Sequence, residues 1–346
     1  MDHDIHAFEQ RPPFGVAADL ANADPLKVWI GGLAVGRATA GRANAPTAFN
    51  ERPGQVTPEK PGRPGQQHRL HNGGMNVREA IVTAIVERLH QDAERIRQEF
   101  FAPGVLSTRF AIVDRLLPDD LAHRIFAAFP PVDRMRLLDS FREKKFTSKA
   151  LDTHDPLIAD ITFAFQDPRV VQAVADLTGI REPHADPKLY AGGISVMTQG
   201  HFLNPHLDNS HDFEQKHYRV LNLLYYCSPD WKTEDGGNFE LWNEAVTEAV
   251  EIPSLFNRLV LMSTNDKSWH SVNPVKRDAK RCCVSNYYFS PHSPNGYETT
   301  HVTYFKARPE QTFQRIWTEA DSRLRTLARI IKKRGFSRKD IFEQKK

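Results

Sequence analysis

Residues 218–227, YRVLNLLYYC, form a run of apolar, aromatic and β-branched side chains without glycine or proline. This composition is typical of a buried strand. Similar runs recur nearby: YAGGISVM (190–197), GNFELW (237–242), NRLVLMS (257–263) and RCCVSNYYFS (281–290). Turn-rich stretches such as EDGGN (234–238) separate them. The sequence therefore predicts an all-β block built as a sandwich or barrel.

A candidate metal site lies just before the run 218–227, in the stretch NPHLDNSHD (204–212). Residues two apart in a strand point to the same side, so His206 and Asp208 can aim an imidazole and a carboxylate at one point. A third ligand is expected from another strand, and His270 follows a predicted strand after a short polar loop. Two histidines and one carboxylate form the facial triad of non-haem Fe(II) oxygenases, although zinc is also compatible with these ligands.

Arg281 favours iron over zinc as the metal. It opens the predicted strand 281–290, which should otherwise be buried. A buried arginine needs an anion, and its planar guanidinium matches a carboxylate. Ser285 and Tyr287 fall on the same strand face. A guanidinium and hydroxyls near a metal suit a dicarboxylate such as 2-oxoglutarate, which chelates iron with one end and presents its distal carboxylate to Arg281.

Five motifs in order resemble the catalytic core of Fe(II)/2-oxoglutarate-dependent dioxygenases, prolyl 4-hydroxylase-like branch: MTQGHFLNPHLDNSHD, YRVLNLLYYCSPDW, EDGGNFELW, NRLVLMSTNDKSWHSVNPV and RCCVSNYYFS. The resemblance covers about residues 190–290. It implies a double-stranded β-helix (jelly roll) with the metal at one mouth. The implied catalytic iron ligands are His206, Asp208 and His270. Cosubstrate binding is implied for Arg281 as the clamp, Tyr226 as a hydrogen-bond partner and Ser285 beside the clamp.

Two positions depart from this family's pattern. Met197 and Leu203 stand where prolyl hydroxylases often carry tyrosines. These departures weaken the case for a prolyl substrate and leave the triad untouched. Asp208 itself favours hydroxylation, because halogenating relatives replace this carboxylate with a small residue.

The resemblance implies a hydroxylase that consumes O2 and 2-oxoglutarate and releases succinate and CO2, with ascorbate keeping the iron reduced. The substrate is expected to be a small molecule or a peptide. Protein side chains, free amino acids and secondary metabolites are all compatible with the sequence. The alternative is a non-catalytic, cupin-like module that uses the same metal for binding or sensing.

The chain outside the predicted core divides into three regions. Gly and Pro make up 18 of the first 74 residues, which predicts a disordered extension over 1–74. The pattern Asn76-x-x-Glu79 resembles a capping box, and apolar residues from Val77 to Ile96 recur at helical spacing, so that a helix opens a helical support region, 76–188. The jelly-roll core is expected over 189–306, and a helix with a basic tail over 309–346. The expected fold is mainly β with flanking helices (α+β).

Composition indicates a cytoplasmic protein. No apolar run approaches the ~20 residues of a membrane span, and the polar N-terminal segment predicts no secretory leader. Cys227, Cys282 and Cys283 lie in strand-like runs without a CxxC pair, so we expect reduced core thiols. Between Arg323 and Lys346, ten basic residues stand against two acidic ones. We interpret this tail as solvated and not as a nucleic-acid site, because no aromatic residues for base stacking are interleaved.

Other conspicuous residues receive structural interpretations. We expect His211 and Asp212 to be solvated, and His201 and His217 to be structural or exposed. Asn222 either lines the site or satisfies a backbone group. The residues expected to serve packing or a tight turn are Trp242, Trp269, Gly236 and Gly237.

Deleting residues 1–74 is expected to leave the melting temperature and the activity nearly unchanged, because a segment of this composition buries little apolar surface. Thermal unfolding and turnover of the full and shortened chains would test this. A large loss of either property would show that the segment contributes to the folded protein.

Overall fold

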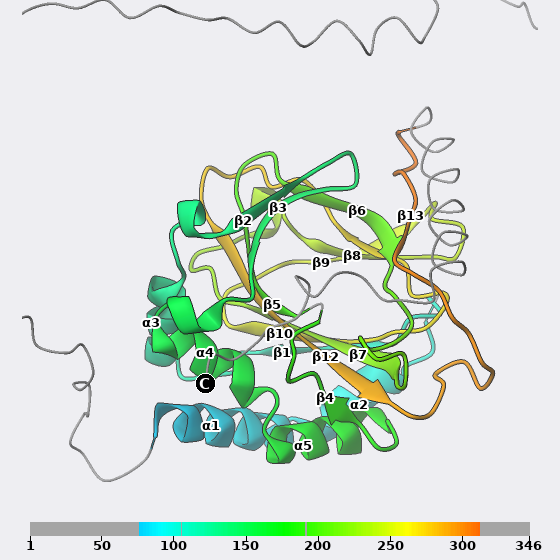
Figure 1. Ribbon diagram of the computed structural model, residues 1–346, viewed down its shortest axis with the longest axis horizontal. Coiled ribbons are helices and arrows are strands. Elements are labelled where there is room, and N and C mark those ends of the chain that lie inside the picture. The colour runs from blue at the N-terminus through cyan, green and yellow to red at the C-terminus, as the bar shows by residue number, and fades with distance from the viewer. Residues whose placement is uncertain (1–75, 105, 191, 312–346) are drawn as a thin grey trace, which may run out of the picture. The chain divides into compact units, whose positions relative to one another are not determined.

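The computed structural model describes residues 76–311 apart from 105 and 191 (Figure 1). The predicted extension 1–74 and the predicted C-terminal helix with its basic tail lie outside the described residues. Within the described part, no helix is both long enough and apolar enough to cross a membrane.

Five α-helices and thirteen strands make up the described chain. The helices are α1 (Val77–Gln91), α2 (Ala93–Phe101), α3 (Asp119–Ala128), α4 (Pro156–Ala164) and α5 (Pro168–Thr178). The first strands are β1 (Phe110–Asp114), β2 (Arg136–Asp139), β3 (Glu143–Ser148) and β4 (His184–Ala185). The following strands are β5 (Gly193–Met197), β6 (Phe202–Leu207), β7 (Tyr218–Tyr226), β8 (Phe239–Trp242), β9 (Ala249–Ile252), β10 (Arg258–Ser263), β11 (His270–Val272), β12 (Arg281–Ser290) and β13 (Tyr304–Phe305).

Strands β5 to β12 form two four-stranded halves whose pairs are all antiparallel. One half has the order β10-β7-β12-β5 and the other the order β6-β11-β8-β9. The chain passes from one half to the other at most connections, so that neighbours in space are distant in sequence. This is the strand order of a double-stranded β-helix, and the predicted jelly-roll core is confirmed. Strand β3 lies between β5 and β6 and joins the two halves.

The pleat of the central strands divides their side chains between two environments. On β7, Leu221, Leu223 and Tyr225 belong to the large apolar core. Their neighbours Asn222 and Tyr226 line the internal cavity instead. On β12 the same alternation sends Val284 and Tyr288 to the core and Arg281, Cys283, Ser285 and Tyr287 to the cavity. Successive strand residues point to opposite faces, so one strand serves both packing and site.

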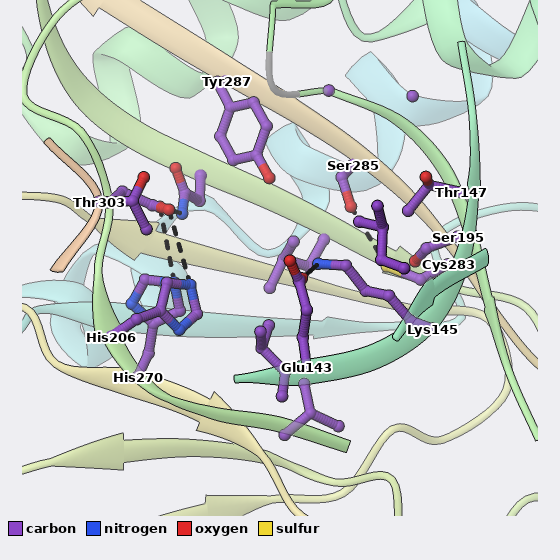
Figure 2. Close-up of a pocket in the computed structure, with 18 of the residues that line it drawn as sticks. Glu143, Lys145, Thr147, Ser195, His206, His270, Cys283, Ser285, Tyr287 and Thr303 are labelled. Carbon is purple, nitrogen blue, oxygen red and sulfur yellow. Dashed lines mark hydrogen bonds and ion pairs between the residues drawn. The ribbon is translucent and has the colours of Figure 1, made fainter. Parts of the chain in front are cut away.

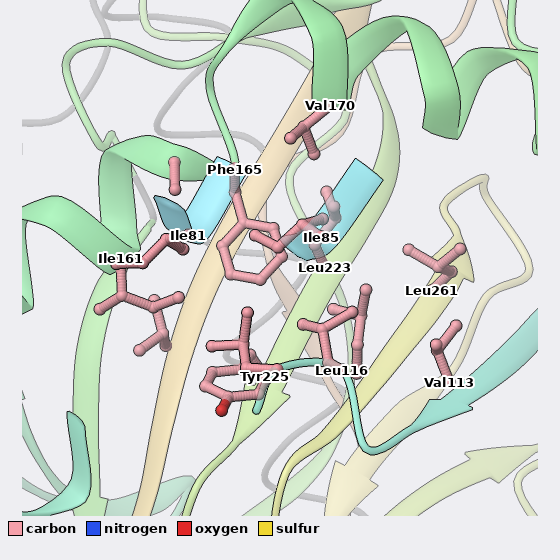
Figure 3. Close-up of a cluster of buried hydrophobic side chains, with 14 of the residues drawn as sticks. Ile81, Ile85, Val113, Leu116, Ile161, Phe165, Val170, Leu223, Tyr225 and Leu261 are labelled. Carbon is pink, nitrogen blue, oxygen red and sulfur yellow. The ribbon is translucent and has the colours of Figure 1, made fainter. Parts of the chain in front are cut away.

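The large core lies between these strands and the helices (Figure 3). Ile81 and Ile85 of α1 and Leu223 of β7 are at most 1% exposed. The phenol of Tyr288 donates a hydrogen bond to the carbonyl of Phe165, at 2.5 Å, and so ties β12 to the end of α4. The helices therefore support the outer face of the half that carries Arg281.

The start of α1 follows the prediction in part. The side chain of Asn76 accepts a hydrogen bond from the backbone N–H of Arg78, at 3.2 Å, as an N-cap does. Glu79, expected to complete a capping box, instead forms an ion pair with Arg169. The apolar spacing predicted one continuous helix through Ile96, which is wrong, because the chain breaks at Asp92 between α1 and α2.

The region expected to give helical support also supplies β1, β2 and β3 to the sheet. Strand β3 reads EKKFTS and is half-buried along its whole length. A polar strand of this kind carries none of the apolar signal that marked the core strands, which is why the sequence did not reveal it.

Replacing Leu223 with alanine should lower the free energy of unfolding by about 2–5 kcal/mol, because it leaves a cavity between β7 and the helices. Equilibrium urea unfolding would measure this. The control is Val250→Ala on β9, where the side chain is 41% exposed and the expected change is within about 0.5 kcal/mol. Equal losses of unfolding free energy in the two variants would contradict the burial of Leu223 in the core.

Candidate metal and cosubstrate site

Three predicted ligands meet at one point of the cavity (Figure 2). His206 on β6 lies directly opposite His270 on β11, with ring centroids 4.1 Å apart. Asp208 follows two residues after His206. Its carboxylate oxygens lie 3.7 Å from Nε2 of His206 and 3.5 Å from Nε2 of His270.

An irregularity in the β6–β11 pairing helps to aim these residues. His270 is paired with His206 and Val272 with Leu203, so two steps along β11 match three along β6. An extra residue of this kind bends a strand and redirects its side chains. Without it, the alternation along β6 would send Leu203 and His206 to opposite faces. Both in fact line the cavity.

The backbone fixes the tautomer of both imidazoles. Nδ1 of His206 lies 3.0 Å from the carbonyl of Asn204, and Nδ1 of His270 lies 2.9 Å from the carbonyl of Ser268. A carbonyl can only accept, so each Nδ1 carries the proton and each Nε2 presents a lone pair. Metal-binding histidines are commonly oriented in this way.

Asp208 is held by two side chains from β7. Asn222 donates a hydrogen bond to its Oδ2 at 2.7 Å, and Nη1 of Arg219 lies 3.1 Å from the same oxygen. The Arg219 side chain is 1% exposed and also donates to Asn209 at 2.8 Å. Because both partners engage Oδ2, the other oxygen, Oδ1, is left to serve as a ligand.

The protonation states match those of metal ligands. Burial, aided by the neighbouring His270, lowers the pKa of His206 to about 3. Burial likewise lowers the pKa of His270. Burial alone would raise the pKa of Asp208, but Arg219 and the two histidines outweigh it and hold that pKa low. Two neutral imidazoles and one ionised carboxylate are therefore expected near neutral pH, as coordination requires.

The donor set fits a divalent transition metal. Ligand atoms about 2.0–2.2 Å from one ion and at right angles to each other lie roughly 3 Å apart. The 3.7 Å between Oδ1 of Asp208 and Nε2 of His206 is slightly wider, and one ligand atom of each of the three residues lies within 4.8 Å of the others, so small side-chain movements would close the site on an ion. Two imidazoles and a carboxylate are the ligands of non-haem Fe(II) centres.

Arg281 is the second feature of the cavity. It is 3% exposed and forms no ion pair with any described residue. Its Nη2 donates to the hydroxyl of Ser254 at 3.0 Å, and its guanidinium lies 4.6 Å from the ring centroid of Tyr226. A buried guanidinium with neutral neighbours alone carries an uncompensated charge, which an anionic ligand would neutralise.

Tyr226 and Ser285 line the same cavity as Arg281. Burial raises the pKa of the Tyr226 phenol, which therefore stays protonated and able to donate. The hydroxyl of Ser285 lies 3.7 Å from Sγ of Cys283. The cavity measures about 440 Å³, within the size range of small-molecule sites.

The structure also places the other residues singled out from the sequence. His211 was expected to be solvated, which is wrong: it is 8% exposed and packs on Tyr218. Asp212 pairs with His217 at 2.8 Å. His201 is buried and contacts Phe146.

Three features of the site were not found from the sequence. Arg219 stands in the apolar run 218–227, and a charge in such a run could have indicated a buried ion pair. Ser254 lies in a loop and gave no signal. The cavity wall contributed by Glu143 and Lys145 of β3 gave none either, because their strand was not predicted.

Comparison with known proteins identifies the class of protein. Residues 192–289 match the sequence profile of the 2OG-Fe(II) oxygenase superfamily. The chain therefore carries a domain of this superfamily, as predicted, and is an oxygenase that uses Fe(II), 2-oxoglutarate and O2. No match was found among curated proteins.

Several solved structures are similar at low identity. A prolyl-4-hydroxylase from Pseudomonas putida is 15% identical, with 60% of this chain and 98% of that chain covered and a TM-score of 0.39. A prolyl hydroxylase from Trichoplax adhaerens, in complex with a peptide fragment of the hypoxia inducible factor oxygen degradation domain, is 16% identical, with coverage of 62% and 90% and a TM-score of 0.38. HygX from Streptomyces hygroscopicus, with nickel, 2-oxoglutarate and hygromycin B bound, is 14% identical, with coverage of 52% and 82% and a TM-score of 0.37.

Asn222→Ala should weaken metal binding roughly 10-fold or more, because partners that orient a ligand commonly contribute this much. His206→Ala should abolish specific binding. Titration with Co(II), followed through its visible spectrum, would measure both. Asn286→Ala is the matched control, since this buried asparagine on β12 contacts Gln166 and the carbonyl of Thr162 instead of the triad. Unchanged affinity in His206→Ala would refute the ligand set.

Proposed function

We propose that His206, Asp208 and His270 hold Fe(II) in this chain and that Arg281 anchors 2-oxoglutarate for the hydroxylation of an organic substrate. One observation carries the proposal. Three convergent metal donors and a buried arginine without an acidic partner among the described residues share a single cavity. The triad needs a metal, and the arginine needs an anion.

When bound, Fe(II) and 2-oxoglutarate would supply the chemistry of O2 activation, in which one oxygen atom is inserted into a substrate C–H bond and the other is incorporated into succinate with release of CO2. The chain's own residues position these reactants. Nε2 of each histidine and Oδ1 of Asp208 would hold the metal. Arg219 and Asn222 keep Asp208 oriented through Oδ2.

Arg281 would bind the distal carboxylate of 2-oxoglutarate through its guanidinium. Ser254 and the ring of Tyr226 already fix the orientation of that guanidinium. Tyr226 would donate a hydrogen bond to the cosubstrate, and Ser285 would line its binding site. Preorganised donors of this kind bind an anion without the cost of ordering them.

Aromatic side chains shield the two histidines from water. The ring of Phe305 on β13 stacks on His206 with centroids 5.2 Å apart. The ring of Phe239 on β8 lies 5.7 Å from that of His270. Exclusion of water protects a reactive oxidising centre from side reactions.

Substrate and setting are proposals as well. We propose a small-molecule or peptide substrate, ascorbate as the reductant that restores Fe(II), and a cytoplasmic location. The three free and buried cysteines support a reducing compartment. Ascorbate is carried over from the resemblance to related oxygenases.

Anaerobic addition of Fe(II) and 2-oxoglutarate should produce a weak charge-transfer band in the visible, and O2 should then produce succinate. Arg281→Ala should raise the 2-oxoglutarate requirement roughly 10- to 100-fold, because a charged hydrogen-bonding partner is lost. The control is Arg95→Ala on the surface of α2, where the side chain is 50% exposed.

The outcome also separates the hydroxylase from a non-catalytic module. A folded, iron-loaded protein that shows no band, or the same requirement in Arg281→Ala, would contradict the clamp. A band without succinate formation across a substrate panel would favour the binding or sensing module.

A further inference from the structure

The cavity has a charged wall that the proposed chemistry does not use. It is formed by the β2–β3 hairpin. We call Arg136, Lys145, Thr147 and Lys149 the hairpin row. Lys145, Thr147 and Lys149 alternate along β3 and its end, Arg136 lies opposite Thr147 in the β2–β3 register, and all four line the cavity.

The charge of the cavity is unbalanced towards positive. Apart from Asp208 in the triad, the cavity lining contains four cationic side chains, Arg136, Lys145, Lys149 and Arg281, and one carboxylate, Glu143. The distal carboxylate of 2-oxoglutarate would neutralise Arg281. The positive charge that remains lies on the hairpin row.

The side chain of Lys145 extends into the cavity that also contains His206 and His270 (Figure 2). Its ammonium forms a 3.0 Å ion pair with Glu143, and the two side chains are 21% and 23% exposed. Lys145 and the two proposed histidine ligands thus line the same cavity.

Resting on the proposed function, we propose that the substrate is a small organic anion whose carboxylate or phosphate binds the hairpin row. Arg136 forms no ion pair with a described residue and supplies a planar donor pair for such a group. Lys145 supplies up to three donors, of which Glu143 engages some. Thr147, which lies opposite Arg136 and two residues from Lys145 on β3, adds a hydroxyl.

Ligands of other charge fit this wall less well. A cationic ligand would meet three positive side chains and could use Glu143 only by breaking its pair with Lys145. A neutral ligand would displace water from these charges without replacing its hydrogen bonds, which costs affinity. An anion compensates the excess charge, and the Lys145–Glu143 pair can persist beside it.

The test uses four probes with one skeleton: hexanoate, hexyl phosphate, hexanol and hexylamine. They are added to the full-length protein loaded with Zn(II) and saturated with 2-oxoglutarate, which closes the Arg281 end to the probe. Saturation-transfer NMR gives the affinities. Hexanoate or hexyl phosphate should bind roughly tenfold or more tightly than hexanol and hexylamine. Their relative affinities decide between a carboxylate and a phosphate substrate.

Variants assign the effect to the hairpin row. Lys145→Met and Arg136→Gln should each weaken anion binding roughly tenfold. Lys144→Met is the matched control, because this neighbouring lysine points away from the cavity and pairs with Asp139 on the surface. Glu143→Gln should leave anion binding equal or tighter, since it frees Lys145.

The charge-transfer band of the anaerobic Fe(II) and 2-oxoglutarate complex, recorded separately, keeps the two proposals distinguishable. A normal band with equal affinities for all four probes, or with no effect of Lys145→Met, overturns the anionic substrate alone. If the band is lost while the protein still prefers the anionic probes, the proposed 2-oxoglutarate site is wrong. The hairpin row would then bind anions without being part of a substrate site. A fifth probe, 6-aminohexanoate, is added for comparison. If it binds more tightly than the other four and Glu143→Gln weakens its binding, the substrate would be zwitterionic, which contradicts the proposal.

Discussion

The pleat of β7 and β12 is the constraint on which the rest of the molecule depends. Alternate residues of each strand pack under the helices, while those between them face the cavity. The same backbone hydrogen bonds therefore fix the large core and the position of Arg281, Tyr226 and Asn222. A shift of register by one residue would exchange the two faces, burying Arg281 in apolar surroundings and exposing leucines to the cavity. The apolar face thus enforces the register that the site needs.

The second constraint is that each buried charge of the site needs a partner that compensates it. Asp208 and Arg219 form a buried ion pair, and Asn222 and Asn209 supply hydrogen bonds to it. Such a pair is tolerated because Asp208 also accepts a hydrogen bond from Asn222 and Arg219 also donates one to Asn209. Arg281 lacks a charged partner among the described residues, and only hydroxyl, thioether and aromatic groups surround it. The protein itself thus compensates the charge of Asp208, whereas the charge of Arg281 is left for an anionic ligand.

Strands β12 and β7, which carry Arg281 and Asn222, could be predicted because they are apolar runs interrupted by single polar residues. Strands β6 and β11, which carry His206 and His270, are too short or too polar to show such a pattern. Arg281 stood out against the apolar residues of β12, whereas the spacing of His206 and Asp208 stood out without such a background. Strand β3 could not be predicted, since a half-buried strand of sequence EKKFTS has the composition of a loop. The burial of His211 depends on Tyr218, whose ring packs against it at a tilt across a β-bridge, and no local sequence pattern records such a contact. The break at Asp92 was hidden because apolar spacing continues across it.

Strand β3 joins the two halves of the sheet, yet it precedes the segment 192–289 that matches the oxygenase profile. The wall opposite the metal is thus encoded apart from the strands that hold the triad and Arg281. Substitutions in the β2–β3 hairpin can alter the shape and charge of the cavity without touching the hydrogen bonds that orient His206 and His270. On the proposed function, the side chains of the hairpin can therefore vary in size and charge, while its backbone keeps the hydrogen bond to Asn204, whose carbonyl orients His206.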